Sequence, residues 1–369
     1  MKILIFGPKE PLGGVETIVL AYAKQLILKG CECDFLLYEN YPALEAKIYD
    51  IGGKCLHATS RRISYSQYKA DLKNIFKTKY DAVWCNFSGL TNIDLLKLAK
   101  KSGIPTRIVH SHASALCWGS PLMRILVPIM HYKNKPFIDR YATHIWACSI
   151  KSGHFMYPKR IWDKITVWNN GVNLQAFFPD DQKREYLRET LDINNKLVIG
   201  HVGRICREKN QYFLLKVYKE FLNRNPNAHL LFLSDAPNDV MVDFAKSLDV
   251  DKQITFLTGQ QDLPTLYNAM DVFFLPSIIE GLPLVISEAQ ACGVPCVIST
   301  GVSREGDLTG YVDFLSLDDS IEKWCEALEN ASNKRIPNPA SSIRKNNYDI
   351  LHECQKMYNF FLQNRQGSD

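Results

Sequence analysis

Short apolar runs alternate with helical patterns along the first half of this 369-residue chain. The apolar runs read as strands at 2–6, 33–37, 54–56, 82–86, 106–110 and 144–148, and helical patterns lie at 15–29, 41–50, 66–77 and 92–101. Such alternation is typical of a parallel sheet whose two faces are both covered by helices. The first half is therefore predicted to be an α/β domain of this kind.

Turn-forming residues cluster at 169–171 and again at 179–181, which marks the best domain boundary. A second alternating block follows, with strands at 197–202, 230–234, 254–258, 272–275 and 295–298 and helices at 211–223, 239–248 and 263–269. The chain ends in one long helical pattern over 342–366. The length also favours two domains, which we predict at 1–170 and 171–341.

Two glutamates follow the predicted strand at 272–275. Glu280 lies in the loop after the strand, and Glu288 lies roughly one to two turns into the next helix. In open parallel sheets, ligands bind outside the carboxyl ends of strands and near helix N-termini. Backbone N–H groups at Leu284 and Val285 would hold a phosphate there, and the carboxylates would accept sugar hydroxyls. This pattern suggests a nucleotide-sugar site; the alternative is one carboxylate that balances the helix dipole and one surface glutamate.

Two cations follow the strand at 197–202. Arg204 comes directly after Gly203, and Lys209 opens the next helical region. Side chains at such a strand end can neutralise a phosphate, and helix N–H groups add to the same positive field. The pair therefore indicates a diphosphate site, with a surface salt-bridge role as the alternative.

A glycine pair, Gly13 and Gly14, lies between the first strand and the first helix. Without side chains, this loop would let the backbone approach a diphosphate closely; a simple tight turn is the alternative. Residues 7–14 do not form a Gly-x-Gly-x-x-Gly pattern, so a nicotinamide cofactor is not indicated.

Composition excludes several classes of protein. Eleven cysteines, an odd number, with no secretory signal before them, indicate reduced thiols in a cytosolic protein. No apolar run reaches the roughly 18–20 residues that a membrane span needs. No His, Cys or Asp cluster has metal-ligand spacing, so no metal is predicted.

The segment 107–164 is basic, with nine Lys or Arg against two Asp. Inside it, residues 120–130 follow Trp118 and form an apolar helical pattern in which Leu122, Leu126 and Ile129 share a face. Such a helix would bind an anionic membrane surface, or else its apolar face is core packing. Aromatic-rich recognition motifs are absent, so nucleic acid is not an expected partner.

Residues 267–277, followed by Glu280-Gly281-Leu282-Pro283 and by 288–295, resemble the retaining glycosyltransferases of family four. The likeness is strongest to the branch of bacterial capsule and exopolysaccharide synthesis. Further pieces match in order over nearly the whole chain, namely the Gly13-Gly14 loop, 108–112, 170–173, 201–204 with Lys209-Asn210, and 313–319.

This resemblance implies a GT-B fold, in which two Rossmann-like domains face each other across a cleft. The N-terminal domain would take the acceptor and the C-terminal domain the donor, and the segment 342–369 would return to the first domain. By the same resemblance, the donor sugar contacts Glu280, the donor ribose contacts Glu288, and the diphosphate contacts Arg204 and Lys209. No cofactor or metal is implied. Further donor contacts would come from Gly13, Gly14, Gly203, Gly281, Leu284 and Val285.

Two histidines end the predicted strand at 106–110. His110 best matches the family histidine that faces the transferred sugar, and His112 is the alternative for that place. The family resemblance implies that the leaving phosphate accepts the acceptor's proton on the same face of the sugar. A double displacement through Glu280 is the less favoured route.

We therefore expect a retaining hexosyltransferase, in the cytosol or peripheral on the inner face of the plasma membrane, that moves a hexose or N-acetylhexosamine from a UDP-sugar to a lipid-linked oligosaccharide. A UDP-sugar epimerase of the same fold and a catalytically silent scaffold of an assembly complex are the alternatives. Two departures from the family concern the donor. Residues 234–237 replace a glycine-rich turn, and Ile278-Ile279 are apolar where polar residues are common.

Overall fold

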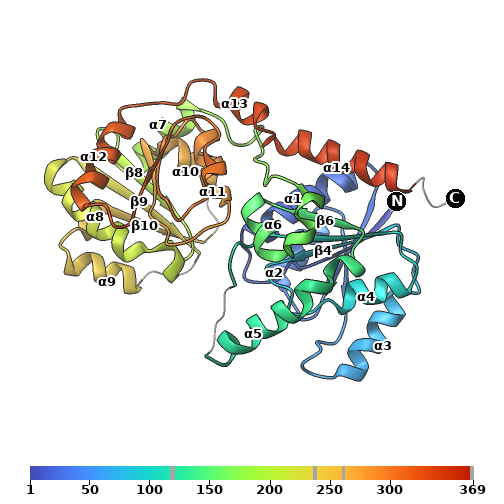
Figure 1. The fold of residues 1–369 in the computed structure, drawn as a ribbon. Coiled ribbons are helices and arrows are strands. Elements are labelled where there is room, and N and C mark those ends of the chain that lie inside the picture. Colours follow the sequence, from blue (N-terminus) through green and yellow to red (C-terminus); the bar gives the residue numbers. More distant parts are fainter. Residues whose placement is uncertain (117–120, 236–238, 260–261, 366–369) are drawn as a thin grey trace. The chain divides into compact units, whose positions relative to one another are not determined.

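The computed structural model describes residues 1–116, 121–235, 239–259 and 262–365. The chain separates into two compact units (Figure 1). One unit comprises Met1–Asn170 and the segment from Ile350 onward, and the other comprises Gly171–Asp349. The chain thus leaves the first unit once, builds the second, and returns.

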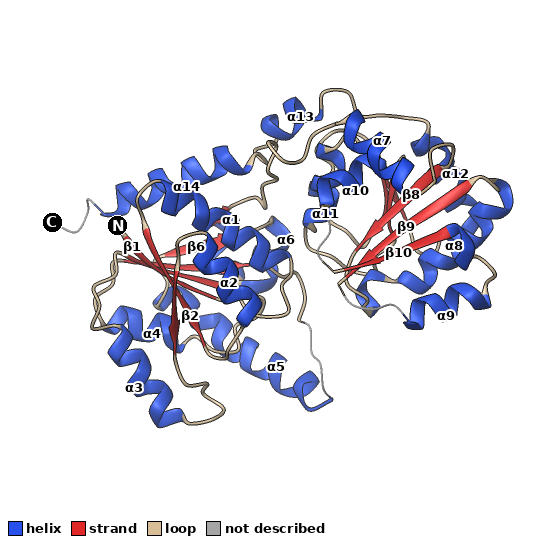
Figure 2. Ribbon diagram, turned by 180° about the vertical axis from the view of Figure 1, so that it is seen from behind, coloured by secondary structure: helices blue, strands red, loops and turns tan. Residues whose placement is uncertain are grey.

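The first unit contains a parallel sheet with the order β3-β2-β1-β4-β5-β6-β7. Its strands are β1 (Lys2–Phe6), β2 (Glu32–Leu37), β3 (Lys54–His57), β4 (Ala82–Phe87), β5 (Thr106–Ser111), β6 (His144–Ala147) and β7 (Ile165–Val167). The helices of this unit are α1 (Gly14–Leu28), α2 (Pro42–Asp50), α3 (Tyr65–Ile75), α4 (Asp94–Lys101), α5 (Pro121–Asn134), α6 (Ile150–Met156) and α14 (Ile350–Arg365), with 3-10 turns η1 (Lys135–Arg140) and η2 (Lys159–Lys164). Figure 2 shows helices on both faces of the sheet, as the alternating pattern predicts.

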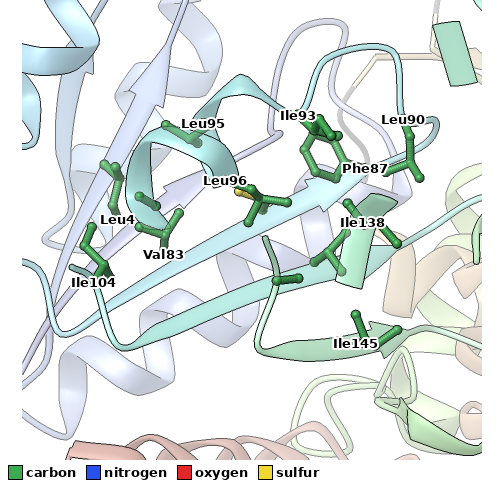
Figure 3. Close-up of a cluster of buried hydrophobic side chains, with 14 of the residues drawn as sticks. Leu4, Val83, Phe87, Leu90, Ile93, Leu95, Leu96, Ile104, Ile138 and Ile145 are labelled. Atoms are coloured by element: carbon green, nitrogen blue, oxygen red, sulfur yellow. The ribbon is translucent and has the colours of Figure 1, made fainter. Parts of the chain in front are cut away.

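One of the apolar cores of this unit lies between the sheet and α4 (Figure 3). Leu4 and Val83 of the central strands meet Leu96 of α4, and Ile138 and Ile145 close the cluster at its other end. The burial of these apolar side chains is the main favourable contribution that holds the helices against the sheet.

The C-terminal helix α14 belongs to the first unit, where it packs along α1 (Figure 1). Lys29 Nζ donates a hydrogen bond to Gln355 Oε1 at 2.6 Å, and the Phe360 ring meets Trp146 edge-on at 4.9 Å between centroids.

The prediction of one continuous helix over 342–366 is wrong. The segment forms α13 (Pro339–Lys345) in the second unit and α14 in the first. Asn347 adopts a left-handed backbone (φ 61°), and Asp349 pairs with Val172 as an isolated parallel bridge. A left-handed residue cannot continue a right-handed helix, so the pattern is cut there.

The second unit contains a parallel sheet with the order β10-β9-β8-β11-β12-β13. Its strands are β8 (Leu197–Val202), β9 (Ala228–Ser234), β10 (Ile254–Thr258), β11 (Val272–Leu275), β12 (Cys296–Ser299) and β13 (Val312–Leu315). Its helices are α7 (Asp181–Thr190), α8 (Gln211–Arg224), α9 (Asp239–Ser247), α10 (Leu263–Ala269), α11 (Leu284–Ala291), α12 (Ile321–Ser332) and α13, with 3-10 turns η3 (Arg207–Lys209), η4 (Asp251–Gln253) and η5 (Arg304–Gly306).

Adjacent residues of β8 enter opposite cores of this unit. Ile199 packs in the cluster that contains Phe221 of α8 and Trp324 of α12, whereas Val198 packs in the cluster that contains Ile286 of α11. Because successive side chains of a strand point to opposite faces, this sheet is buried on both sides.

Candidate functional site

The second unit brings three of its predicted site residues, Arg204, Lys209 and Glu280, to loops at the same edge of its sheet. The strand order reverses between the paired strands β8 and β11, and ligands of open parallel sheets bind outside the carboxyl ends at such a reversal. The loop after β8 carries Arg204 and Lys209, and the loop after β11 carries Glu280. The N–H of Ile278 donates to the carbonyl of Glu208 at 2.7 Å, which joins the two loops.

An ion pair links two of the predicted residues. Lys209 Nζ lies 2.9 Å from Glu280 Oε1, and the two side chains are only 13% and 19% exposed. The lysine stem lies against Gly203, where an added Cβ would sit 3.2 Å from Lys209 Cε. Arg204 is exposed beside them. The site thus combines a shielded charge pair with a cation that faces solvent.

The loop that carries Glu280 is fastened to the chain after β12. The N–H of Glu280 donates to the carbonyl of Gly301 at 3.1 Å, and the Ser299 hydroxyl donates to the carbonyl of Ser277. A Cβ at Gly301 would lie 2.2 Å from the Ile278 carbonyl oxygen, so no larger residue fits there without movement. Sequence reasoning missed Ser299 and Gly301, because nothing local relates them to Glu280.

A buried polar network supports the backbone at Arg204. Gln211 Nε2 donates to the Arg204 carbonyl at 2.8 Å and lies 3.4 Å from His201 Nε2. His201 Nδ1 lies 3.0 Å from the Phe274 carbonyl and therefore carries the proton. Burial lowers the pKa of His201 to about 4, so this ring is a neutral connector between β8 and β11. Sequence reasoning also missed Gln211.

Glu288 lies inside α11, one turn from its start, as predicted. Its side chain is buried and accepts a hydrogen bond from the Tyr267 hydroxyl at 3.0 Å. Burial raises the pKa of Glu288 to about 7, against the opposing effect of the Tyr267 hydrogen bond. The helix begins at Leu284 after Pro283, which provides no side-chain cap for the first N–H groups, including that of Val285.

The glycine loop of the first unit is held by the carboxylate of Glu16. Gly14 begins α1, but the carboxylate of Glu16 accepts from the N–H of Gly13 at 3.0 Å and from that of Lys9 at 3.3 Å. Glu16 thus engages the N–H of Gly13, in the loop whose backbone was predicted to approach a diphosphate. The signal that sequence reasoning missed is Glu16 itself, three residues after Gly13 at a helix start.

The two histidines of the first unit have different surroundings. His110, on β5, is 1% exposed and accepts from Trp84 Nε1 at 3.3 Å, with its ring edge-on to Trp146. His112 follows the strand and is partly exposed, with Nε2 2.8 Å from Asn86 Oδ1. The structure therefore places His110 against Trp84 and Trp146, and it places His112 just after the end of the strand.

Helix α5 exposes an apolar face. Its exposed side chains, between 37% and 62% accessible, are Leu122, Ile125, Leu126, Ile129 and Tyr132. The alternative that the predicted stripe is core packing is therefore wrong for Leu122, Leu126 and Ile129. Trp118 and Ser120, which the sequence pattern included, lie outside the described residues, as do residues 236 and 237 of the predicted donor-loop departure.

Within the described ranges, no three His, Cys, Asp or Glu side chains gather as metal ligands would. The same part of the chain contains no helix with the length and apolarity of a membrane span.

Two protein-family models match this chain in succession. The model described as Glycosyltransferase Family 4 matches residues 12–176, and the model described as Glycosyl transferases group 1 matches residues 182–346. Each model falls almost entirely in one structural unit.

Curated relatives match over most of their length. The putative glycosyltransferase EpsF of Bacillus subtilis is 29% identical, over 87% of this chain and 85% of the relative. The UDP-Gal:alpha-D-GlcNAc-diphosphoundecaprenol alpha-1,3-galactosyltransferase of Escherichia coli is 27% identical, over 95% of this chain and 94% of the relative. The capsular polysaccharide biosynthesis glycosyltransferase CapM of Staphylococcus aureus is 30% identical, over 61% of this chain and 64% of the relative.

Solved structures share the fold over the whole chain. The Anabaena HepE structure in complex with UDP and glucose has a TM-score of 0.74 at 19% identity and covers 98% of this chain and 100% of HepE. Sucrose-phosphate synthase from Thermosynechococcus elongatus has a TM-score of 0.77 at 14% identity and covers 100% of both chains. With both family models matched in order on two Rossmann-like units, this chain belongs to the family 4 glycosyltransferases of the GT-B fold.

Proposed function

We propose that this protein transfers a hexose or N-acetylhexosamine, with retention of configuration, from a UDP-sugar to a lipid-linked saccharide in capsule or exopolysaccharide synthesis. The observation that carries the proposal is the grouping of Arg204 and the Lys209–Glu280 pair at the strand reversal of the second unit. The names of the EpsF, CapM and galactosyltransferase relatives support the pathway and the acceptor class. UDP in the HepE complexes supports the nucleotide.

The donor diphosphate would bind Arg204 and Lys209. Lys209 already balances Glu280, so a phosphate oxygen would take over part of the lysine's charge and leave the carboxylate free to accept sugar hydroxyls. The first N–H groups of α11 add a second positive end to this site, at Leu284 and Val285. Glu288, further along the same helix, would accept from the ribose.

The proposed reaction breaks the bond between the anomeric carbon and the β-phosphate oxygen and forms a bond to the acceptor oxygen on the same face of the sugar. The proton of the acceptor hydroxyl passes to the leaving phosphate, so UDP is released and no covalent enzyme intermediate forms. Positive charge develops on the sugar and negative charge on the phosphate. The protein's part is therefore electrostatic stabilisation by Arg204 and Lys209 and alignment of the two substrates. This route needs no metal or other cofactor.

His112, and not His110, is the histidine that we assign to the transferred sugar. The His110 ring is enclosed by Trp84 and Trp146, whereas the His112 ring lies at the end of β5.

The exposed face of α5 would place the enzyme on an anionic membrane, where a lipid-linked acceptor resides. The face combines five apolar side chains with the cations Arg124 and Lys133 of the same helix. Apolar burial in the lipid interface and attraction to anionic headgroups would act together.

Incubation with a panel of UDP-hexoses and UDP-N-acetylhexosamines, with and without a polyprenyl-diphosphate sugar, tests this function. The expected result is release of UDP that depends on the acceptor, together with a product whose new linkage keeps the donor's configuration by NMR. Epimerised donor in the absence of acceptor would indicate the epimerase instead. Binding of UDP without any turnover across the panel would indicate the silent scaffold.

A further inference from the structure

Asn86 lies at the point where the sheet of the first unit reverses its strand order. It belongs to β4, which pairs with β1 on one side and with β5 on the other. The chain after β1 passes so close that a Cβ at Gly7 would lie 2.2 Å from the Asn86 carbonyl oxygen, and Gly7 has a φ of +126°. Carboxyl ends at such a reversal are where open parallel sheets bind ligands.

The hydrogen bonds of Asn86 determine the orientation of its amide. Its Nδ2 lies 3.2 Å from the carbonyl oxygen of Phe6, which can only accept, so the NH₂ group must lie on that side. Its Oδ1 then lies 2.8 Å from His112 Nε2. An amide oxygen can only accept, so His112 Nε2 carries the proton.

The second ring nitrogen of His112 therefore carries a lone pair. This Nδ1 is buried and has no hydrogen-bond partner in the described part of the chain. Burial lowers the pKa of His112 to about 3, so the ring is neutral. A buried acceptor without a partner is destabilising, and such an atom at a sheet reversal indicates a ligand that donates to it.

The neighbouring ring of His110 is also held in one tautomer. Trp84 Nε1 can only donate, so its 3.3 Å contact makes His110 Nδ1 the acceptor and leaves the proton on Nε2. The two imidazole centroids are 4.2 Å apart, and His110 Nε2 is likewise buried without a partner among the described residues. Because the His110 ring is enclosed by Trp84 and Trp146, the nitrogen that we assign to a ligand is His112 Nδ1.

We infer that Asn86 is a positioning residue for sugar transfer: it holds His112 in the Nε2–H tautomer and so presents Nδ1 as the acceptor for a sugar hydroxyl. The inference rests on the proposed function for the identity of the ligand. The tautomer itself follows from the hydrogen-bond geometry alone.

The kinetic test compares Asn86→Ala, Asn86→Asp, His112→Gln and the double variant Asn86→Ala/His112→Gln. Asn86→Ala is expected to lower kcat roughly 10- to 100-fold, by analogy with the loss of residues that orient the histidines of metal sites. UDP affinity should be unchanged, because Arg204 and Lys209 lie in the second unit. Asn86→Asp keeps an oxygen that accepts from His112 Nε2 but loses the NH₂ donor to the Phe6 carbonyl, so it is expected to lower kcat less than Asn86→Ala does. The double variant should be no slower than His112→Gln alone.

The matched control is Asn92→Ala, which removes another asparagine of the first unit that bonds Tyr68 and the N–H of Asp94. It should lower the melting temperature as Asn86→Ala does but leave kcat unchanged. Equal losses of kcat in both variants, or fully additive losses in the double variant, would overturn the positioning role.

Long-range ¹H–¹⁵N NMR of the histidine rings tests the tautomer without any activity. His112→Gln identifies the signal, which should report a protonated Nε2 in the wild-type protein and a mixture of tautomers in Asn86→Ala. A wild-type ring protonated at Nδ1 would refute the inference. If the wild-type protein transfers no sugar from any donor, the proposed function fails, and this spectrum still decides whether Asn86 sets the tautomer.

Discussion

Lys209 Nζ lies 2.9 Å from Glu280 Oε1, although the two residues come from loops that follow different strands. Both side chains are largely shielded from water, so each charge is stabilised mainly by the opposite charge of its partner. Sequence reasoning gave them separate ligands, the diphosphate and the sugar. Because they are paired, replacing one of the two residues leaves the charge of the other without its partner and so changes how strongly it can bind the donor.

Replacing Glu280 by Gln should therefore separate binding from catalysis. The change keeps the shape and frees the Lys209 ammonium from its partner, so UDP affinity should stay equal or rise by a few fold. Sugar transfer should fall by about 100-fold or more, comparable to loss of one preorganised electrostatic group. Calorimetry with UDP and initial rates with the donor check the two parts. Wild-type turnover in the Glu280→Gln variant would contradict the assignment.

Lys209→Met should have the opposite signature. The variant leaves the Glu280 carboxylate shielded and unpaired at the site of the diphosphate, so UDP should bind at least about 10-fold more weakly. The double variant Lys209→Met/Glu280→Gln removes this repulsion and should recover part of the lost affinity. Lys216→Met, on the neighbouring helix α8, is a control that should leave UDP binding as it is. Unchanged affinity in Lys209→Met would remove this lysine from the diphosphate site.

Glu288 should make stability depend on pH. Its pKa is raised by burial to about 7, compared with about 4.3 in an unfolded chain. Between these values the folded state binds more protons than the unfolded state, so the free energy of unfolding should fall as pH rises from about 4.5 to 7. The contribution, on the order of 3 kcal/mol, is fully present below about pH 4 and lost above about pH 7. Urea unfolding across this range should show a steeper decline in the wild-type protein than in Glu288→Gln; parallel curves would mean that Glu288 titrates normally.

Gly301→Ala should displace the loop that carries Glu280. The added Cβ would meet the Ile278 carbonyl at 2.2 Å, far inside van der Waals contact, so the loop must shift. We expect turnover to fall at least about 10-fold, since small displacements at a reacting centre are costly. Gly306→Ala is the matched control, because its Cβ would find an ordinary 3.4 Å contact with Leu282 Cδ1. If both variants retain full turnover, the attachment through Gly301 does not position Glu280.

The face of α5 should determine binding to anionic membranes. Ile125→Glu places a carboxylate in the exposed apolar face, and Arg124→Glu with Lys133→Glu reverses the nearby charge. Each variant should sediment less with vesicles of anionic phospholipid than the wild-type protein does. Ile63→Glu, which changes a highly exposed isoleucine elsewhere in the first unit, should sediment as the wild type does. Undiminished sedimentation of the α5 variants would exclude this face as the contact.

Most strands could be predicted from the sequence because apolar runs mark them clearly. The predicted strands at 2–6, 197–202, 254–258 and 272–275 have the same bounds as β1, β8, β10 and β11, and the other predicted strands differ from the observed ones by one or two residues at an end. β7 is only three residues long, and β13 is interrupted by the exposed Asp313, so neither formed a recognisable run. Helix α7 consists mostly of charged and polar residues, so it contains no apolar run that would mark it in the sequence.

The site was only partly predictable for a different reason. Positions at strand ends follow from the alternating pattern, which is why Arg204, Lys209 and Glu280 could be named. Contacts between loops depend on which strands are neighbours, so the Lys209–Glu280 pair and the Gly301 attachment could not be read from the chain. Our proposal of His112 over His110 depends on Trp84 and Trp146, which lie on the strands beside β5, and the chain alone does not show which strands are neighbours.

The N–H of Val172 donates to the carbonyl of Tyr348 at 2.7 Å, so the entry and the exit of the second unit are tied together. Residues 171–349 are therefore an inserted domain whose first and last residues lie next to each other. We therefore expect that residues 171–349 can be produced as a separate protein with their whole sheet. The same continuity would allow this unit to be exchanged between related proteins as a single segment.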